Sequence, residues 1–443
     1  MSLFDWIKPG LNLKRWIIMG TLGVLVFILG VSKLLFRGAI FDWYFLLYLY
    51  ITIIGIMFIY ISTKFIFKSI FALFMGAANN NGLNRHKIEE LLYEQRLLIR
   101  GPRIVAIGGG TGLSTMLRGL KEYTSNITAI VTVADDGGGS GVLRESLGIL
   151  PPGDIRNCLV ALANTEPLME ELMQYRFKEG NLKGQSFGNL FIAAMSGISS
   201  NFEEAIKKMS DVLAVQGKVF PATLSNVTLC AKLEDGSIVR GESKIPEAAL
   251  EKKTKIESIY LEPGDVKPLE EAIMAIESAD CIIMGPGSLY TSVLPNLVIK
   301  EIAESVKNSK AIKVYVSNIM TQPGETDGYK LSNHLEAIEK HCGKGIINYV
   351  IANNGKIPEE YYEKYINDGQ YIVETDLENI DDDIFVIQEN FVDINKYGYL
   401  RHNTRKLANT IMRLVLKQVF PKNRRRILDY YYLSEKIKDK TEV

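Results

Sequence analysis

The feature of the sequence best suited to chemistry is a run of glycines that directly follows an apolar segment. Residues 104–113 read IVAIGGGTGL, and a helical pattern, STMLRGLKEY, follows them. Glycine lets the backbone approach a ligand closely, and the N–H groups of a helix start face an anion. The spacing is not the GxGxxG of dinucleotide sites, so it does not by itself indicate NAD. The pattern predicts an anion-binding turn made of Gly108, Gly109, Gly110, Thr111 and Gly112.

Two adjacent carboxylates follow the next β-branched segment, in the run VADDGGGSG. Asp135 and Asp136 stand at the expected carboxyl end of a second strand, where a ribose hydroxyl or a magnesium ion is typically held. Capping of a helix would explain one aspartate, but hardly both of them. We therefore treat both as candidate ligand-binding residues, and if magnesium is used we expect it at Asp135 or Asp136.

Further polar turns occur where other predicted strands and helices meet. In PPGDIRN, Asp154 is expected to cap a helix, with Arg156 and Asn157 pointing from its first turn toward a phosphate or a base. The strand DCIIM leads into a second candidate phosphate turn, and the strand KVYV ends beside Asn318. The residues of that second turn are Gly285, Pro286, Gly287 and Ser288. Turns at the carboxyl ends of parallel strands converge on one crevice, and this convergence is the main reason to expect a binding site.

No catalytic nucleophile or acid–base pair is identified. The run SFGNL resembles a nucleophile elbow only superficially, because its second flanking glycine is missing. The chain has only four histidines, which disfavours a Ser-His-Asp hydrolase.

The elements that must position these turns alternate along the chain from residue 103 onward. Short β-branched runs are separated by longer helical stretches, and several runs are apolar without alternation, as strands covered on both faces must be. This order predicts an α/β fold with a doubly wound, Rossmann-like, mainly parallel sheet. Residues 218–261 hold closely spaced strands and turns, so we expect an inserted antiparallel piece there.

The first 78 residues are different in character. Residues 16–36 and 43–61 are two apolar runs, each close to the roughly 20 residues that cross a bilayer. A cleaved signal peptide is the alternative, but no small-residue cleavage site follows the first run. We predict a transmembrane hairpin, followed by an interfacial segment at residues 65–74. Basic residues flank the outer ends of the two runs, so the positive-inside rule places the N-terminus and the main domain in the cytoplasm.

The rest of the chain divides into three expected parts. Residues 79–100 read as a linker helix, residues 101–420 as the ligand-binding domain and residues 421–443 as a basic tail. The tail is expected to be a solvated helix or an unstructured end, with contact to lipid headgroups as an alternative. The formal net charge of zero argues against a nucleic-acid partner. The four cysteines show no CxxC or Cys/His spacing and are expected to be buried thiols in a reducing compartment.

Together, GGGTG, ADDGG, PPGDIRN, SFGNL, GPGSLYTS and SNIMTQPGET resemble the YvcK family of gluconeogenesis factors, which is related to the CofD phospholactate transferases. The resemblance covers roughly residues 103–416. It implies a domain that binds UDP-N-acetylglucosamine, with no required cofactor. It also implies a regulator that links gluconeogenic carbon supply to peptidoglycan precursor synthesis and cell shape, with an enzyme of amino-sugar or cell-wall precursor synthesis as its partner. Homo-oligomerisation is left open.

The resemblance also implies positions for individual residues. The two glycine turns would hold the diphosphate, while Asp135, Asn157 and Asn189 would line the cleft. Arg401, in the run RHNT, would bind the phosphate or the sugar, because its guanidinium fork suits such oxygens. A surface arginine at a helix start is the alternative. Tyr365 is a further candidate for stacking or a hydroxyl contact.

This chain departs from the family pattern at Asn403, where the family has aspartate, and at Gly139 and Val142, where it has serine and arginine. We expect no contacts from those serine and arginine side chains here, whereas the backbone contacts should remain. Two functions therefore stay open at this point. One is a ligand-binding regulator; the other is a CofD-like, magnesium-dependent transferase of a phosphate-containing group.

Overall fold

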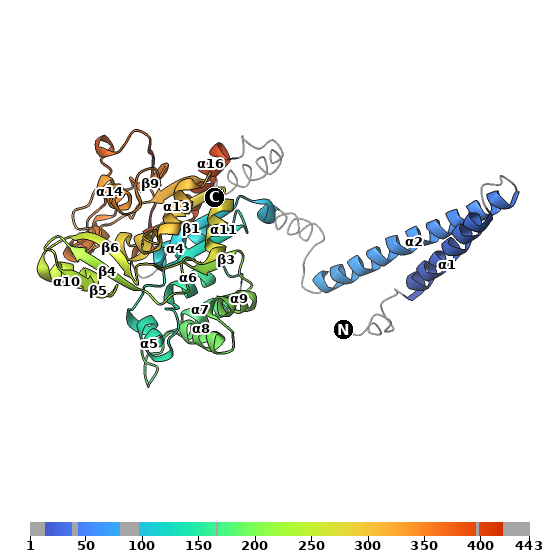
Figure 1. The fold of residues 1–443 in the computed structure, drawn as a ribbon, viewed down its shortest axis with the longest axis horizontal. Helices are drawn as coiled ribbons and strands as arrows, with labels where there is room; N and C mark the ends of the chain where they lie inside the picture. Colours follow the sequence, from blue (N-terminus) through green and yellow to red (C-terminus); the bar gives the residue numbers. More distant parts are fainter. Residues whose placement is uncertain (1–13, 38–42, 80–96, 165–166, 396–397, 420–443) are drawn as a thin grey trace. The chain divides into compact units, whose positions relative to one another are not determined.

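The computed structural model describes residues 14–37, 43–79, 97–164, 167–395 and 398–419. These residues form two compact units, Met1–Gln95 and Arg96–Val443 (Figure 1). Of the expected linker helix, residues 97–100 are helical and most of the remainder lies outside the described residues. The basic tail also lies outside them.

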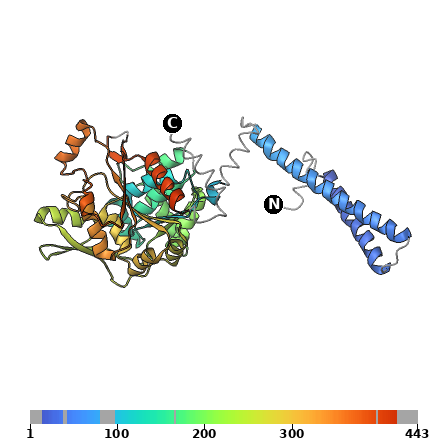
Figure 2. The same ribbon diagram turned by 90° about the horizontal axis from the view of Figure 1, so that it is seen from above.

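The first unit is a pair of packed helices, α1 (Lys14–Arg37) and α2 (Trp43–Asn79), which run side by side in both views (Figures 1 and 2). Their apolar stretches, Ile18–Phe36 and Trp43–Phe65, are long enough to cross a membrane. Glycines allow the close approach: a Cβ added at Gly55 would lie 2.6 Å from the backbone nitrogen of Phe27. The expected interfacial segment is not a separate element, because α2 continues through it to Asn79 with no proline to interrupt it.

The hairpin can be tested by a disulfide between its two helices. A Cβ at Gly20 would lie 3.3 Å from the Cβ of Ser62, close to the separation found in disulfides. We expect the Gly20→Cys/Ser62→Cys chain to lose two titratable thiols on mild oxidation, measured by alkylation and mass spectrometry after unfolding. Thr63 is exposed one position along α2, so the Gly20→Cys/Thr63→Cys chain is the matched control and should keep both thiols. Equal cross-linking of the two pairs would contradict this packing.

The second unit is built on a seven-stranded sheet in the order β10-β9-β8-β7-β1-β2-β3. Every neighbouring pair is parallel, so the predicted doubly wound, Rossmann-like sheet is confirmed. The central strands β1 and β7 are buried along their whole length, as strands covered on both faces must be. The strands are β1 (Ile104–Gly108), β2 (Ile127–Val131), β3 (Lys218–Pro221), β7 (Cys281–Met284), β8 (Ile312–Val316), β9 (Tyr349–Asn353) and β10 (Phe385–Glu389).

Helices pack against one another in two groups. In one group α4 contacts α6 and α16, and in the other α13 contacts α11 and α14, as expected for helices on the two faces of a doubly wound sheet. The helices of the second unit are α4 (Gly110–Leu120), α5 (Gly138–Leu147), α6 (Gly153–Leu162), α7 (Pro167–Gln174), α8 (Phe187–Gly197), α9 (Phe202–Val212), α10 (Lys244–Lys252), α11 (Glu270–Ser278), α12 (Leu294–Leu297), α13 (Lys300–Asn308), α14 (Leu331–Cys342), α15 (Glu359–Asn367) and α16 (Thr404–Gln418).

The expected antiparallel piece exists, but it begins later than predicted. Strands β4 (Thr228–Leu233), β5 (Ile238–Arg240) and β6 (Ile256–Glu262) form a three-stranded antiparallel sheet that lies with α10 at one end of the domain (Figure 1). The start of the expected piece, β3, instead pairs in parallel with β2 at the edge of the main sheet. A short hairpin of β11 (Val392–Ile394) and β12 (Leu400–His402) precedes α16.

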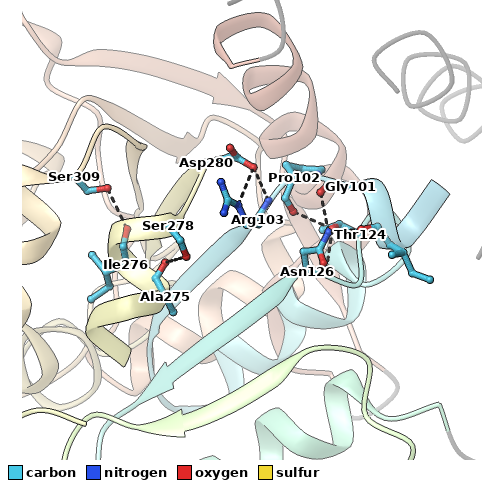
Figure 3. Close-up of polar contacts among 11 residues, drawn as sticks. Gly101, Pro102, Arg103, Thr124, Asn126, Ala275, Ile276, Ser278, Asp280 and Ser309 are labelled. Atoms are coloured by element: carbon cyan, nitrogen blue, oxygen red, sulfur yellow. Dashed lines mark hydrogen bonds and ion pairs between the residues drawn. The ribbon is translucent and has the colours of Figure 1, made fainter. Parts of the chain in front are cut away.

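Polar contacts fix the amino ends of the central strands, at the sheet edge opposite the glycine turns (Figure 3). The backbone N–H of Arg103 donates to a carboxylate oxygen of Asp280 over 2.8 Å, which joins the starts of β1 and β7. Asn126, just before β2, donates to the carbonyl oxygen of Gly101 over 2.9 Å. These contacts hold the strands in register, so their carboxyl ends finish together at the other edge.

The cysteines behave as expected for core residues. Cys158, Cys230 and Cys281 are buried, Cys342 is partly buried, and all four are free thiols. Burial raises the pKa of each of them, so none is activated as a thiolate nucleophile.

Candidate functional site

The candidate site lies where the strand order of the main sheet reverses, between β1 and β7. In open α/β sheets this switch point opens a crevice at the carboxyl ends of the strands. The turns after these two strands touch backbone to backbone: a Cβ at Gly112 would lie 2.6 Å from the carbonyl oxygen of Pro286. Gly110 has a φ of +68°, which favours glycine at the tip of the first turn.

A cleft of about 410 Å³ lies against these two turns, and we name it cleft A. It brings together most of the residues expected from sequence, from both glycine turns and from three distant segments. The lining residues are Gly109, Gly110, Thr111, Gly112, Thr115, Pro286, Gly287, Ser288, Ser292, Asn318, Ile319, Met320, Gln322, Tyr365, Gln370, Leu400, Arg401 and His402. Helix α4 starts here, and the N–H groups of its first turn have no partner within the helix, so this wall of the cleft suits an anion.

Three of the predicted side chains line cleft A and also hold its walls. The amide oxygen of Asn318 accepts a hydrogen bond from the N–H of Gly287 over 3.2 Å. The hydroxyl of Tyr365 accepts one from the N–H of Leu400 over 2.8 Å. Arg401 donates from Nη1 to the carbonyl oxygen of Leu400 over 2.7 Å, which leaves other N–H groups of its fork for a ligand.

A smaller cavity of about 310 Å³ adjoins cleft A, and we name it the acidic cavity. The two share Gly110, Ser288, Ser292 and Gln322. Four carboxylates line the acidic cavity: Asp135, Asp154, Glu242 and Glu325. Among the described residues no group of three or more acids, histidines or cysteines has the arrangement of a complete metal site.

Burial is the main influence on these acids. It raises the pKa of Asp154 to about 6 and that of Glu325 to about 7, and it also raises the pKa values of Asp135 and Glu242. Hydrogen bonds work in the opposite direction: Glu325 accepts from Thr291 Oγ1 over 3.0 Å, and Asp154 from the N–H of Gly110. Glu242 Oε2 is buried and has no hydrogen-bond partner among the described residues. The cavity therefore favours bound protons or a cation.

Four candidates from sequence lie behind the cleft rather than in its lining. Asp136 points to the start of α10, where its carboxylate accepts a hydrogen bond from the N–H of Ser243 over 2.9 Å. Gly108 and Gly285 are buried at the strand ends. Asn189 is also buried. Asp154 does not cap α6 as expected, because the N-cap is Pro152 and the carboxylate faces the acidic cavity.

Asn157 and Asn189 both hold the guanidinium of Arg156. Asn189 Oδ1 accepts from Nη1 and Asn157 Oδ1 accepts from Nη2, each over 2.8 Å. Ser186 Oγ accepts from Nη1 as well and also caps α8 through the N–H of Asn189. Asn157 lines a cavity next to cleft A. Asn189 is only 3% exposed and lines neither that cavity nor cleft A.

We expect Asn189→Ala to act on stability rather than on ligand binding. It removes an acceptor from a buried charged group, which should lower the free energy of unfolding by about 2 kcal/mol. The measurement is urea unfolding of the full chain in detergent, alongside ligand affinity. Asn308 is exposed at the end of α13, and Asn308→Ala should change stability by less than about 0.5 kcal/mol. An affinity loss without a stability loss would instead place Asn189 at the ligand.

Several lining residues had not been singled out from sequence. Thr115 sits one turn into α4, while Ser292 and Gln322 lie in the recognised runs GPGSLYTS and SNIMTQPGET without having been named as site residues. Helical spacing from Thr111 to Thr115 was a usable signal. Glu242 had none, because it belongs to the antiparallel insertion and reaches the site only through the tertiary fold.

Comparison with known proteins is consistent across sequence and structure. Residues 104–392 match the family model described as 2-phospho-L-lactate transferase CofD. A Clostridium acetobutylicum protein, provisionally named a gluconeogenesis factor, is 51% identical over 99% of this chain and 98% of its own. The gluconeogenesis factor of Bacillus subtilis is 48% identical over 71% of this chain and 98% of its own.

A solved structure shows the same fold. It is the crystal structure of a UPF0052 family member from Bacillus halodurans, 49% identical, with a TM-score of 0.67. The match covers 70% of this chain and 98% of that one.

Proposed function

This chain belongs to the CofD family and to the gluconeogenesis factors within it, and from this premise we propose that cleft A binds UDP-N-acetylglucosamine and that the chain acts as a regulator. The observation that carries the proposal is the backbone contact of two glycine turns at the switch point, beside Arg401. A diphosphate suits the N–H groups of such turns, and arginine suits the remaining phosphate or sugar oxygens.

The size and lining of cleft A support a sugar nucleotide. Its volume falls within the range of small-ligand pockets, and polar groups from two glycine turns and three other segments converge on it. The test is calorimetric titration of UDP-N-acetylglucosamine into the full chain in dodecyl maltoside. Absence of binding at millimolar ligand would refute the proposed ligand.

Arg401→Ala should weaken that binding by about tenfold, since a charge-assisted hydrogen bond is worth about 1.5–3 kcal/mol. Arg405 is the matched control, because it is exposed one helical turn further along and lines none of the cavities described above. We expect Arg405→Ala to keep its affinity within twofold. An Arg401→Ala chain with full affinity would remove this residue from the proposed site.

The kinds of residue that line cleft A support a regulatory role. Binding turns are abundant in cleft A, and no nucleophile paired with a base occurs among its described lining residues. In this role, occupancy of cleft A by the sugar nucleotide signals carbon supply to an enzyme of amino-sugar or cell-wall precursor synthesis. The chain would affect cell shape through that enzyme, because the enzyme supplies precursors of the cell wall. The regulatory role would be contradicted if the chain binds the ligand, but deleting its gene changes neither growth on gluconeogenic carbon sources nor cell shape.

The acidic cavity favours a second candidate function, a magnesium-dependent transferase of a phosphate-containing group. Magnesium usually takes one or two carboxylates together with substrate phosphates, so a complete protein-only site is not required. Asp135 and Asp154 adjoin the phosphate turn and would hold the ion, and the unpartnered Glu242 oxygen fits a cavity that accepts a cation. Bound magnesium would neutralise phosphate charge. Product formation from a nucleotide donor, lost in Asp135→Ala, would support transfer over regulation.

The N-terminal unit anchors the chain in this proposal. Two helices of sufficient length and apolarity fit a membrane hairpin with both ends in the cytoplasm. Anchoring would raise the local concentration of the domain near membrane-bound cell-wall synthesis. A chain lacking residues 1–78 that fully restores cell shape at native expression would make the anchor dispensable.

A further inference from the structure

A second cavity lies beside cleft A and is larger, at about 940 Å³; we name it cavity B. The two cavities share Thr111, Thr115, Arg401 and His402. The other walls of cavity B come from α4, α6, α7 and the segment that holds β11. Each cavity by itself has the size of a small-ligand site. The domain therefore has room for two ligands that meet at Arg401.

The wall of cavity B contains a buried guanidinium without a counterion. Arg156 is only 9% exposed. Its three hydrogen bonds go to neutral acceptors, Ser186, Asn189 and Asn157. Among the described residues no carboxylate lies within ion-pair distance of it, and its Nε has no partner at all. Of its five N–H bonds, three are used, so the Nε–H and one N–H of Nη2 have no hydrogen-bond partner among the described residues.

The charges around Arg156 compensate it only in part. Burial lowers its pKa most, and the neighbouring Arg176 lowers it further; the opposing acid is Asp154, which lines the acidic cavity instead. An unpaired buried charge is costly, and three neutral side chains hold this one in place at the wall of a cavity. A bound anion would supply the missing charge partner.

The remaining charged groups of cavity B are of both signs. Arg118 lines it but is already paired with Glu170 over 2.6 Å. Glu171 and Asp393 also line the cavity and contribute negative charge and hydrogen-bond acceptors. The positive groups left for a ligand are therefore Arg156 and the shared Arg401, with acceptors for hydroxyl or amino groups elsewhere in the lining.

We propose that cavity B is a second ligand site, for a small polyhydroxy or amino compound that carries one phosphate or carboxylate bound by Arg156. This inference rests on the proposed function in one respect, that the sugar nucleotide occupies cleft A at the same time. Arg401 would contact both ligands, so each would influence the binding of the other.

The test uses inorganic phosphate as the probe and acetate as the carboxylate arm. Equilibrium dialysis with radiolabelled phosphate is performed on the full chain in dodecyl maltoside, which contains no phosphate of its own. Without nucleotide we expect two phosphates per chain, one at the glycine turns and one at Arg156. With saturating UDP-N-acetylglucosamine we expect one. Acetate should compete for the Arg156 site if that site accepts carboxylates as well.

Variants separate this site from the glycine turns. Arg156→Met should remove one phosphate in both conditions, and Arg156→Lys should weaken it at least tenfold because the fork is lost. Gln174→Trp adds bulk to the lining of cavity B from the exposed α7, leaves the Arg156 hydrogen bonds intact and should also exclude phosphate. The Gln174→Trp chain can therefore still test the site if the Arg156 variants do not fold.

The outcomes distinguish the two proposals. If UDP-N-acetylglucosamine does not bind but one phosphate still depends on Arg156, the proposed function fails and cavity B stands. If saturating nucleotide displaces both phosphates, one ligand spans both cavities and the second site is refuted. Phosphate binding that is unchanged in Arg156→Met and in Gln174→Trp would refute it as well.

Discussion

Replacing Gly112 by alanine is expected to weaken the binding of UDP-N-acetylglucosamine by roughly 100-fold, about 2.7 kcal/mol. The added Cβ would lie 2.6 Å from the carbonyl oxygen of Pro286 and 2.9 Å from its carbon. Both are backbone atoms, so no side-chain rotation can relieve the overlap. The two glycine turns must move apart, and the N–H groups that face the diphosphate lose their common target.

The second run of glycines offers the control. Gly137 has a φ of −88°, and a Cβ there would come no closer than 3.4 Å to any atom outside its chain neighbours. Gly137→Ala should therefore bind within twofold of the natural chain. Calorimetry gives the affinities, and circular dichroism shows whether each chain is folded. Equal affinities for folded Gly112→Ala and Gly137→Ala would show that the contact between the turns does not shape the site.

The main sheet could be predicted because its strands are strongly patterned. Each of the seven strands is parallel to its neighbours and the central ones are covered on both faces, which demands continuous apolar runs such as DCIIM. The edge strand β3 was assigned to the antiparallel piece, because it begins the stretch of closely spaced strands and turns from which that piece was predicted. The second membrane span was predicted to end at residue 61, whereas α2 continues to Asn79 because no proline interrupts it.

The candidate site could be predicted only where local sequence fixes the backbone. The glycine turns bind through N–H groups, so their position follows directly from the strand-to-helix junctions. The direction of a side chain depends on what packs around it. Asp135 and Asp136 are adjacent in sequence, yet Asp135 lines the acidic cavity and Asp136 holds Ser243. No local pattern distinguishes them, and Glu242 reaches the cavity from the connection between β5 and α10.

Affinity for the sugar nucleotide should fall as pH rises from 5.5 to 8 when no divalent cation is present. The pKa of Asp154 is raised to about 6 and that of Glu325 to about 7, so over this range both carboxyls lose a proton beside cleft A. Each new negative charge repels a diphosphate whose own charge stays constant, because both of its phosphates are esterified. His402 in the cleft lining stays neutral throughout, since burial lowers its pKa to about 4. We expect a loss of at least about tenfold, because two unit charges about 4 Å apart interact by about 1 kcal/mol even at the dielectric constant of bulk water, and two carboxyls ionise over this range.

Asp154→Asn separates this effect from a general influence of pH. The amide can still accept a hydrogen bond from Gly110 but never ionises. The affinity of the Asp154→Asn chain for the sugar nucleotide should therefore fall less steeply with pH, and at pH 8 it should exceed that of the natural chain. The free energy of unfolding should depend on pH in the same direction. A raised pKa means that the folded chain binds the proton more tightly than the unfolded chain, so stability is lost between the unfolded value of 3.8 and the folded value of about 6. The asparagine chain escapes that loss and should be the more stable one at pH 8.

Magnesium and the Asp136→Asn variant test whether the acidic cavity causes this pH dependence. If a cation enters the acidic cavity it should offset the new charges, so millimolar magnesium should restore affinity at pH 8 in the natural chain and have less effect in Asp154→Asn. Asp136→Asn is the matched control, because its carboxylate lies outside the cavity on Ser243 and should leave the pH profile unchanged. A profile that is flat from pH 5.5 to 8 in the natural chain would mean that these acids do not face the bound phosphates. Equal slopes in Asp154→Asn and Asp136→Asn would assign the pH dependence to other groups.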